Sequence, residues 1–205
     1  MGKVTLMLEL VLRSILPPFY SFARIEAICI KRLRRKPDDK YTLWVLSNLY
    51  IHHKQYREAR PYLDTLYRMR KDTKSVRILL SRVYYHLGEY EKVVEILERG
   101  KILSPAEPEV FYLGDSLIEL KEFRAATDNL SRYVNYHHTE YVAFVRLGYA
   151  YYMQGLFDLA IGAYTRAEAL DPRNREIKTS IELCAAEIRK SRRTNDRGCG
   201  DWEPT

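Results

Sequence analysis

Apolar residues recur at intervals of three and four along residues 141–172, YVAFVRLGYAYYMQGLFDLAIGAYTRAEALDP, in two successive runs. This spacing places the apolar side chains of each run on one face of a helix. Gly155 separates the two runs, and Pro172 ends the second because proline cannot continue a helix. Two small residues, Gly148 and Ala160, fall where the two backbones would come closest. The stretch therefore predicts a tight antiparallel helix pair.

The same pattern recurs three times earlier in the chain. The four copies begin at Lys40, Lys74, Glu107 and Tyr141, a near-constant spacing. A repeat of this period indicates helix pairs that bury their apolar faces by stacking on one another. The earlier copies match less fully: Val93 takes a small-residue position, and Lys71 and His138 stand where a proline would end the unit. In the last copy the pattern is carried by Phe144, Leu147, Gly148, Tyr151, Gly155, Phe157, Ala160, Tyr164, Ala167 and Pro172.

On these residues the chain resembles the tetratricopeptide repeat family, whose unit is a helix-turn-helix of about 34 residues. The family's tryptophan is replaced by Phe144 in the last copy. The resemblance covers about two-thirds of the chain. It implies an all-α fold, a right-handed superhelical solenoid of antiparallel helix pairs that ends in a cap helix.

The pattern also predicts how the chain is divided. Residues 175–190 carry apolar positions on one stripe and charges on the other side, as expected of a cap helix at the end of a solenoid. Residues 191–205 show no periodicity and several helix breakers, and we expect a disordered tail. The predicted segments are an N-terminal helical extension at 1–39, repeats at 40–73, 74–106, 107–140 and 141–174, the cap helix at 175–190 and the tail at 191–205.

The N-terminal extension contains two predicted helices. Residues 3–16 form an amphipathic pattern that is too short to span a membrane. This helix either closes the open end of the solenoid or lies against a membrane or a partner. A second helix is expected from about Phe19 to Lys36, with Phe22, Ile25, Cys29 and Leu33 on its buried face. It ends in a basic patch of Lys31, Arg32, Arg34, Arg35 and Lys36.

Charge is distributed unevenly between the two halves of the chain. The net charge of the chain is +7. Residues 1–106 hold 21 Lys and Arg against 11 Asp and Glu, whereas residues 107–205 hold 13 against 16. An anionic partner should therefore meet the N-terminal half first. The basic patch has a simpler explanation as well, because cations at a helix C-terminus are favoured by the helix dipole.

Cysteine and histidine usage gives no sign of a cofactor or metal site. The three cysteines match no metal or redox spacing, and Cys29 and Cys184 fall on apolar stripes, so we interpret them as core thiols of a reduced, cytoplasmic chain. The adjacent pairs His52-His53 and His137-His138 diverge on a helix and cannot chelate one ion together. No phosphate loop, nucleophile elbow or other catalytic constellation is present. We expect no enzyme activity, no cofactor and no metal.

The family resemblance implies that the first helix of each pair lines a concave groove. Val142 and Met153 occupy groove positions in the last repeat. Arg82 and Asp115 are expected to fix the register of a bound segment. The groove residues that we select as candidates for partner binding are Tyr41, Trp44, Asn48, His52, Ile78, Arg82, Tyr85, Phe111, Asp115, Val145, Tyr149 and Tyr152.

Members of the family that bind chaperone tails clamp a C-terminal carboxylate with Lys, Asn and Arg at five fixed positions. In one frame these positions hold Trp44, Asn48, Leu79, Pro108 and Tyr112, and only Asn48 fits. In the next frame they hold Ile78, Arg82, Tyr112, Val142 and Arg146, and only Arg146 fits. The sequence therefore argues against a carboxylate clamp.

We predict a protein–protein interaction scaffold or adaptor that holds a segment of a protein or peptide partner in its groove, within a multiprotein assembly. The alternative is a peripheral membrane-associated assembly factor that docks through its basic N-terminal half, with weak contact between residues 1–36 and an anionic membrane. Nucleic-acid binding ranks lower because the basic residues are spread over helix ends and outer faces. Self-association is left open.

Overall fold

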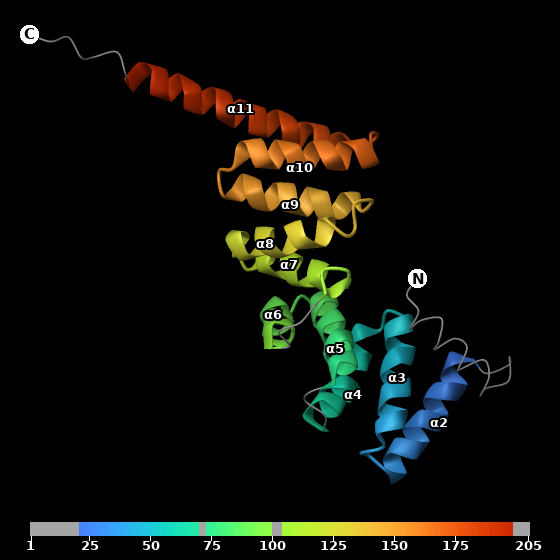
Figure 1. Ribbon diagram of the computed structural model, residues 1–205. Coiled ribbons are helices and arrows are strands. Elements are labelled where there is room, and N and C mark those ends of the chain that lie inside the picture. Colours follow the sequence, from blue (N-terminus) through green and yellow to red (C-terminus); the bar gives the residue numbers. More distant parts are fainter. Residues whose placement is uncertain (1–20, 70–72, 100–103, 199–205) are drawn as a thin grey trace, which may run out of the picture. The chain divides into compact units, whose positions relative to one another are not determined.

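The computed structural model describes residues 21–69, 73–99 and 104–198. Within these ranges the chain forms ten helices, labelled α2 to α11 in Figure 1, and no strand. The prediction of an all-α fold built from helix pairs is confirmed. The chain divides between Val83 and Tyr84, inside α5, into two compact parts, which we call unit 1 and unit 2 and describe separately.

Unit 1 is organised around the pair α3–α4. Leu46 of α3 and Leu63 of α4 are both fully buried between these helices. Ser47 is also fully buried, and its hydroxyl donates a hydrogen bond to the Leu43 carbonyl at 2.6 Å, so its polar atom is satisfied within its own helix. The helices of unit 1 are α2 (Phe22–Arg35), α3 (Lys40–His52), α4 (Tyr56–Met69) and the first part of α5 (Lys74–Leu87).

The first helix, α2, lies against α3. The Tyr50 hydroxyl of α3 donates a hydrogen bond to Glu26 of α2 at 2.5 Å. The ring of Phe22 meets the ring of Tyr50 edge-on, with 5.9 Å between centroids. Cys29 is buried, as the sequence predicts, and so is Cys184 in unit 2. The predicted amphipathic helix at residues 3–16 lies outside the described residues.

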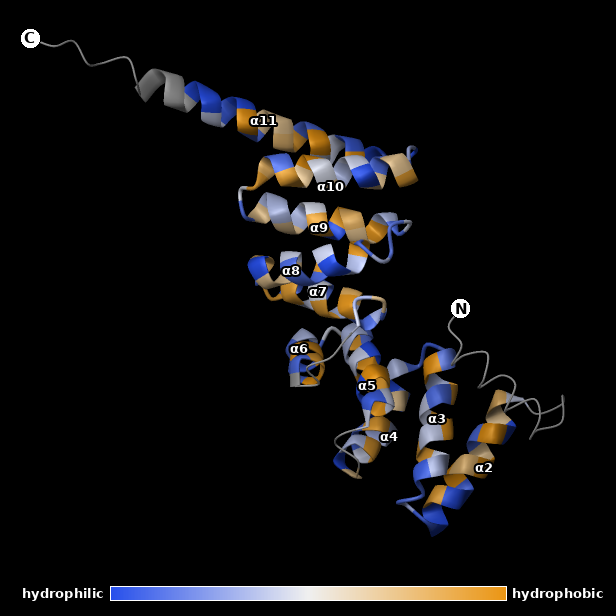
Figure 2. Ribbon diagram, viewed as in Figure 1, coloured by the Kyte–Doolittle hydropathy of each residue, from blue (hydrophilic) through white to orange (hydrophobic). Residues whose placement is uncertain are grey.

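Unit 2 contains the end of α5 and six further helices. Figure 1 shows α7 to α11 stacked as successive layers, with α9, α10 and α11 side by side. Figure 2 shows apolar and polar residues alternating along these helices, as expected when each helix buries one side. The further helices are α6 (Tyr90–Arg99), α7 (Glu109–Glu119), α8 (Phe123–Val134), α9 (Tyr141–Met153), α10 (Phe157–Leu170) and α11 (Arg175–Gly198).

Two glycines let the helices of unit 2 approach closely. A Cβ atom added at Gly148 would lie 2.8 Å from Cε1 of Tyr164, and one at Gly114 would lie 2.7 Å from Cγ of Leu130. Neither distance leaves room for a side chain. The predicted close approach at Gly148 is therefore present, and the ring of Tyr164 fills the space opposite.

Each helix pair turns through one residue in the left-handed backbone region. These residues are Lys54, Gly88, Lys121 and Gly155, with φ of 58°, 74°, 64° and 73°. These four residues occupy the same position in the four predicted repeats. In the last turn the backbone N–H of Leu156 donates to the Tyr151 carbonyl at 3.0 Å, which closes the helix end.

The C-terminal helix is longer than predicted. We expected a cap helix at residues 175–190 and disorder from 191, but α11 continues to Gly198. A helix that has already formed extends at little cost, and residues 191–197 contain no glycine or proline to stop it. The rest of the predicted tail, 199–205, lies outside the described residues.

Candidate functional site

One face of α9 carries an exposed apolar strip. Val142, Tyr149 and Met153 are exposed by 44%, 39% and 44%. Together with Arg146 they follow the spacing of four, three and four residues that keeps side chains on one side of a helix. We call these four residues, Val142, Arg146, Tyr149 and Met153, the α9 strip.

Arg146, in the middle of the α9 strip, is held by two carboxylates of α7. Its Nε donates a hydrogen bond to Oδ1 of Asp115, and its Nη2 donates to Oε1 of Glu119. Asp115 also accepts a hydrogen bond of 2.5 Å from the Tyr85 hydroxyl at the end of α5. One polar network thus joins α5, α7 and α9, which are the first helices of three successive repeats.

The network sets the charge states of Arg146 and Tyr85. Burial works to lower the pKa of Arg146, but the hydrogen bonds and charges of Asp115 and Glu119 outweigh it and raise that pKa. Burial raises the pKa of Tyr85, and the hydrogen bond to Asp115 raises it further. Arg146 is therefore a permanent cation and Tyr85 a neutral hydrogen-bond donor.

The other predicted binding residues of unit 2 contribute less exposed surface. Val145 and Tyr152 are half-buried and pack against a core cluster that includes Tyr164, Ile177 and Cys184. Phe111 and Tyr85 are also half-buried, and Asp115 is 6% exposed. Asp115 was expected to fix the register of a partner. The structure corrects this expectation, because the carboxylate is buried and its hydrogen bonds go to Tyr85 and Arg146.

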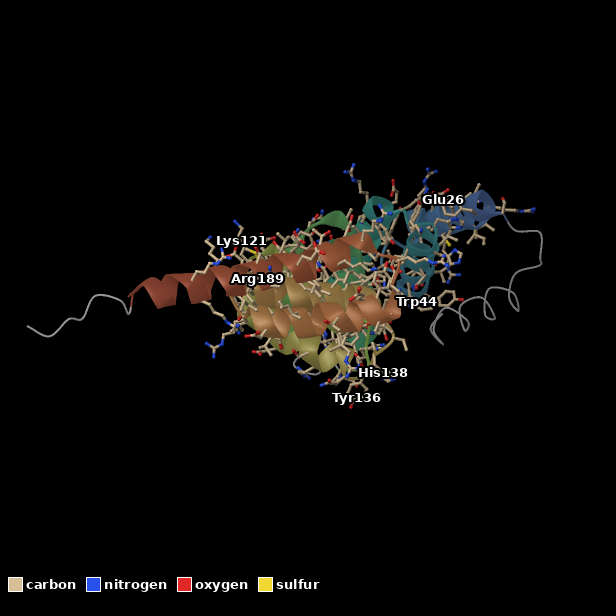
Figure 3. The ribbon with its side chains drawn as sticks, turned by 90° about the horizontal axis from the view of Figure 1, so that it is seen from above. Glu26, Trp44, Lys121, Tyr136, His138 and Arg189 are labelled. Carbon is tan, nitrogen blue, oxygen red and sulfur yellow. The ribbon has the colours of Figure 1, made fainter. Side chains whose placement is uncertain are left out.

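In unit 1 the predicted binding residues lie in varied environments. Tyr41 is 53% exposed and His52 is exposed. Trp44, Ile78 and Arg82 are half-buried, and Figure 3 labels the Trp44 side chain. Asn48 was expected to face a partner, but it is buried and its side-chain amide donates to the Trp44 carbonyl at 2.8 Å. This back-bond satisfies the amide within α3.

The five side chains of the basic patch are all exposed on or just after α2. Arg32 forms an ion pair with Asp39, with 2.5 Å between Nε and Oδ2. Asp39 in turn accepts a hydrogen bond of 2.6 Å from the Thr42 hydroxyl. One cation of the patch therefore stabilises the corner between α2 and α3. Among the residues that the structure describes, the side chains of Lys31, Arg34, Arg35 and Lys36 form no hydrogen bond or ion pair.

Among the described residues, no group of three or more His, Cys, Asp and Glu side chains is placed to hold a metal ion. None of the described helices has the length and apolar character needed to cross a bilayer.

Comparison with known proteins identifies the repeat. The model of the tetratricopeptide repeat matches residues 142–174, which is the predicted last repeat less its first residue. The fold is similar to the crystal structure of YrrB, described as a TPR protein with an unusual peptide-binding site. The TM-score is 0.67 at 16% identity over 78% of this chain and 84% of that chain. The chain belongs to the tetratricopeptide repeat family.

Other comparisons extend the tetratricopeptide repeat assignment along the chain. Residues 52–133 match the family described as anaphase-promoting complex, cyclosome, subunit 3. The structure of MamA residues 41 to the end from Desulfovibrio magneticus RS-1 is similar with a TM-score of 0.62. It is 20% identical over 80% of this chain and 98% of that chain. No curated protein matches the sequence.

Of the α9 strip, sequence reasoning selected Tyr149 and named Val142 and Met153 as groove positions, but it did not select Arg146. Arg146 was considered only as a candidate for a carboxylate clamp. A signal was present: Asp115 and Glu119 are four residues apart, and Arg146 occupies a nearby position of the next repeat. When successive first helices lie side by side, such positions meet.

Proposed function

We propose that the chain is a scaffold that binds a segment of a partner protein along the α9 strip. The observation that carries this proposal is the row of Val142, Tyr149 and Met153, three large apolar side chains each exposed by 39% or more on one helix face. Exposed apolar patches of this kind mark interaction sites. The family assignment supports a protein-binding role, and YrrB is described as having a peptide-binding site.

The geometry also suits recognition without large rearrangement. Tyr149 offers a rigid ring with a polar end, and Met153 offers a flexible apolar chain that adapts to different partners. Arg146 is already fixed by two carboxylates, so binding costs little ordering of that side chain. The binding surface would therefore be preorganised for the partner.

The proposal is tested by substituting the strip and measuring binding. A photo-reactive phenylalanine analogue at position 149 should cross-link the partner, and the same analogue at Tyr136 serves as a control. Tyr136 is 60% exposed and lies at the edge of unit 2 in Figure 3, outside α9. With the captured partner in hand, the double substitution Tyr149→Ala and Met153→Ala should weaken binding about 10- to 100-fold. Equal cross-linking at the two positions and unchanged affinity of the double variant would reject the site.

A second candidate function rests on the basic patch. Unit 1, residues 1–83, holds 18 Lys and Arg against seven Asp and Glu, a net charge of +11. Lys31, Arg34 and Arg35 are exposed together on α2. Cations near an anionic membrane each contribute about 1 kcal/mol. The patch would then hold the scaffold at the surface of a membrane.

Vesicle sedimentation separates this candidate from scaffold binding. The full chain should pellet with vesicles containing phosphatidylserine at low salt, and Lys31→Glu, Arg34→Glu and Arg35→Glu together should abolish it. A matched charge reversal at Arg57, Arg124 and Arg166, which are exposed on other helices, should leave most of the binding. If the variant with the three α2 substitutions pelleted with vesicles as fully as the unchanged chain, the patch would be excluded as a membrane contact.

A further inference from the structure

The charges around the α9 strip point to the chemistry of its partner. The two helices α7 and α9 hold three acidic residues, Glu109, Asp115 and Glu119, and one basic residue, Arg146. The turn that follows α7 adds one charge of each sign, Lys121 and Glu122. Glu109 and Asp115 are buried, so Glu119 is the acidic side chain of these two helices that reaches the surface beside the strip.

The negative charge that solvent can reach lies on Glu119. The side chain of Asp115 is 8% exposed and that of Glu119 is 40% exposed, while both contact Arg146. One cation thus faces two anions, and Glu119 is the carboxylate that an incoming group can reach. The charge of Arg146 is already neutralised by Asp115 and Glu119. A carboxylate of a partner would therefore gain little from Arg146 and would be repelled by Glu119.

The order of groups along α9 sets the pattern of the partner. Val142 precedes Arg146 by one turn, and Tyr149 and Met153 follow it at about one and two turns. Glu119 is hydrogen-bonded to Arg146, the residue of the strip between Val142 and Tyr149. Val142 and Met153 are 11 residues apart, which corresponds to about 16 Å of helix. This length matches about five residues of extended chain.

We propose that the α9 strip binds a short segment that carries a lysine or arginine between apolar side chains, and that it discriminates against acidic segments. The cation of the partner pairs with Glu119, while its apolar side chains cover Tyr149 and Met153 on one side and Val142 on the other. This inference rests on the proposed function and specifies the chemistry of the partner at the same site.

The test uses a probe that requires no known partner. A phage-displayed library of random 12-residue peptides is selected on the immobilised full chain, and the enriched peptides are measured by fluorescence anisotropy. The peptides should contain apolar residues around a Lys or Arg, and Tyr149→Ala should weaken their binding at least tenfold. Replacing the basic residue of the peptide by glutamate should abolish detectable binding.

Charge substitutions in the protein complete the test. Glu119→Gln should weaken binding about threefold to fivefold, as expected for a partly exposed ion pair. Glu119→Lys should weaken it further and should restore binding of the glutamate-substituted peptide. Asp158→Lys serves as the matched control, because Asp158 is exposed on α10 outside the strip, and should change affinity less than twofold.

The outcomes distinguish the inference about a basic partner segment from the proposed scaffold function on which it rests. Enriched peptides that are acidic or uncharged, yet depend on Tyr149, would overturn the inference and leave the scaffold function standing. The same conclusion follows if Glu119→Gln and Asp158→Lys behave alike. A selection that yields no peptide dependent on Tyr149 would overturn both.

Discussion

The pair α3–α4 in unit 1 and the pair α9–α10 in unit 2 treat the same repeat position differently. In unit 1 this position is Ser47, which is fully buried with its Cβ accommodated and its hydroxyl bonded to Leu43. In unit 2 it is Gly148, where a Cβ would lie 2.8 Å from the ring of Tyr164. The size of the facing residue does not explain the difference by itself, because a Cβ at Gly114 in the third repeat would also lie 2.7 Å from a leucine, Leu130. The helices at Gly148 and Gly114 are therefore packed too closely for a Cβ at this position, whereas the pair α3–α4 accommodates one at Ser47.

The two units also differ in how they use ion pairs. In unit 1 Arg32 and Asp39 pair at a corner, with side-chain exposures of 60% and 12%. In unit 2 Asp115 and Arg146 pair across two helices with side-chain exposures of 8% and 29%, and Tyr85 shares the carboxylate. A buried pair costs much more to break than an exposed one, because one charge stays behind without its partner. Unit 2 should therefore depend on its network for both stability and recognition.

The largest predicted effect comes from breaking this network. Asp115→Ala leaves Arg146 and the Tyr85 hydroxyl without their shared acceptor. It should lower the free energy of unfolding by about 2–3 kcal/mol, less than for a fully buried pair because Arg146 is partly exposed. Asp39→Ala in unit 1 should cause a much smaller loss. Urea unfolding followed by circular dichroism measures both, and equal losses would contradict the difference between the units.

The glycine position gives the next largest effect. Gly148→Ala places a Cβ against Tyr164 and should destabilise the chain by about 1–3 kcal/mol, despite the better helix propensity of alanine. The matched change Ser47→Ala keeps an existing Cβ and removes one hydroxyl, so it should cost less than about 1 kcal/mol. Thermal melts of the two variants would show the opposite order if the helix spacing were the same in both units.

A stabilising change is expected at the turns. Lys121 has φ of 64°, a conformation that costs a residue with a Cβ about 1 kcal/mol relative to glycine. Lys121→Gly in unit 2 and Lys54→Gly in unit 1 should therefore each raise stability by up to about 1 kcal/mol. The loss of backbone freedom that glycine suffers on folding reduces the gain. A fall in the melting temperature of both variants would show that the lysine side chains make compensating contacts.

The smallest effect concerns pH in unit 1. The hydrogen bond from Thr42 and the charge of Arg32 lower the pKa of Asp39 below its ordinary value of 3.8, against the opposing effect of burial. The stabilisation is therefore present above pH 3.8 and is lost as pH falls through the lower pKa of the folded state. A carboxyl titration by NMR should give a midpoint below 3.8, and Thr42→Ala should raise it. A midpoint unaffected by Thr42→Ala would assign the shift to another group.

The sequence predicted the repeat register because its signals are local. The helices α3, α5 and α9 begin at Lys40, Lys74 and Tyr141, the expected starts, and α7 begins two residues after Glu107. The glycines at the turns were visible in two repeats. Lys54 and Lys121 adopt the same left-handed backbone conformation, but their residue type does not predict it, since packing of the helix pair imposes the turn.

The candidate site was harder to predict because it depends on neighbouring helices. Val145 and Tyr152 share repeat positions with groove residues, yet they pack into the core cluster that also contains Ile177 and Cys184 of α11. Asp115 and Arg146 are 31 residues apart in the chain. Their pairing requires the relative position of α7 and α9, which periodicity within one helix does not give.

The most direct test of the account is hydrogen exchange of the full chain with and without a selected 12-residue peptide. The central claim is that unit 2 binds partners along α7 and α9. The account predicts slower exchange of amides at residues 109–119 and 141–153 when the peptide is bound, with little change at residues 40–52 in α3. Protection confined to α3 or to the basic helix at residues 22–35 would contradict it.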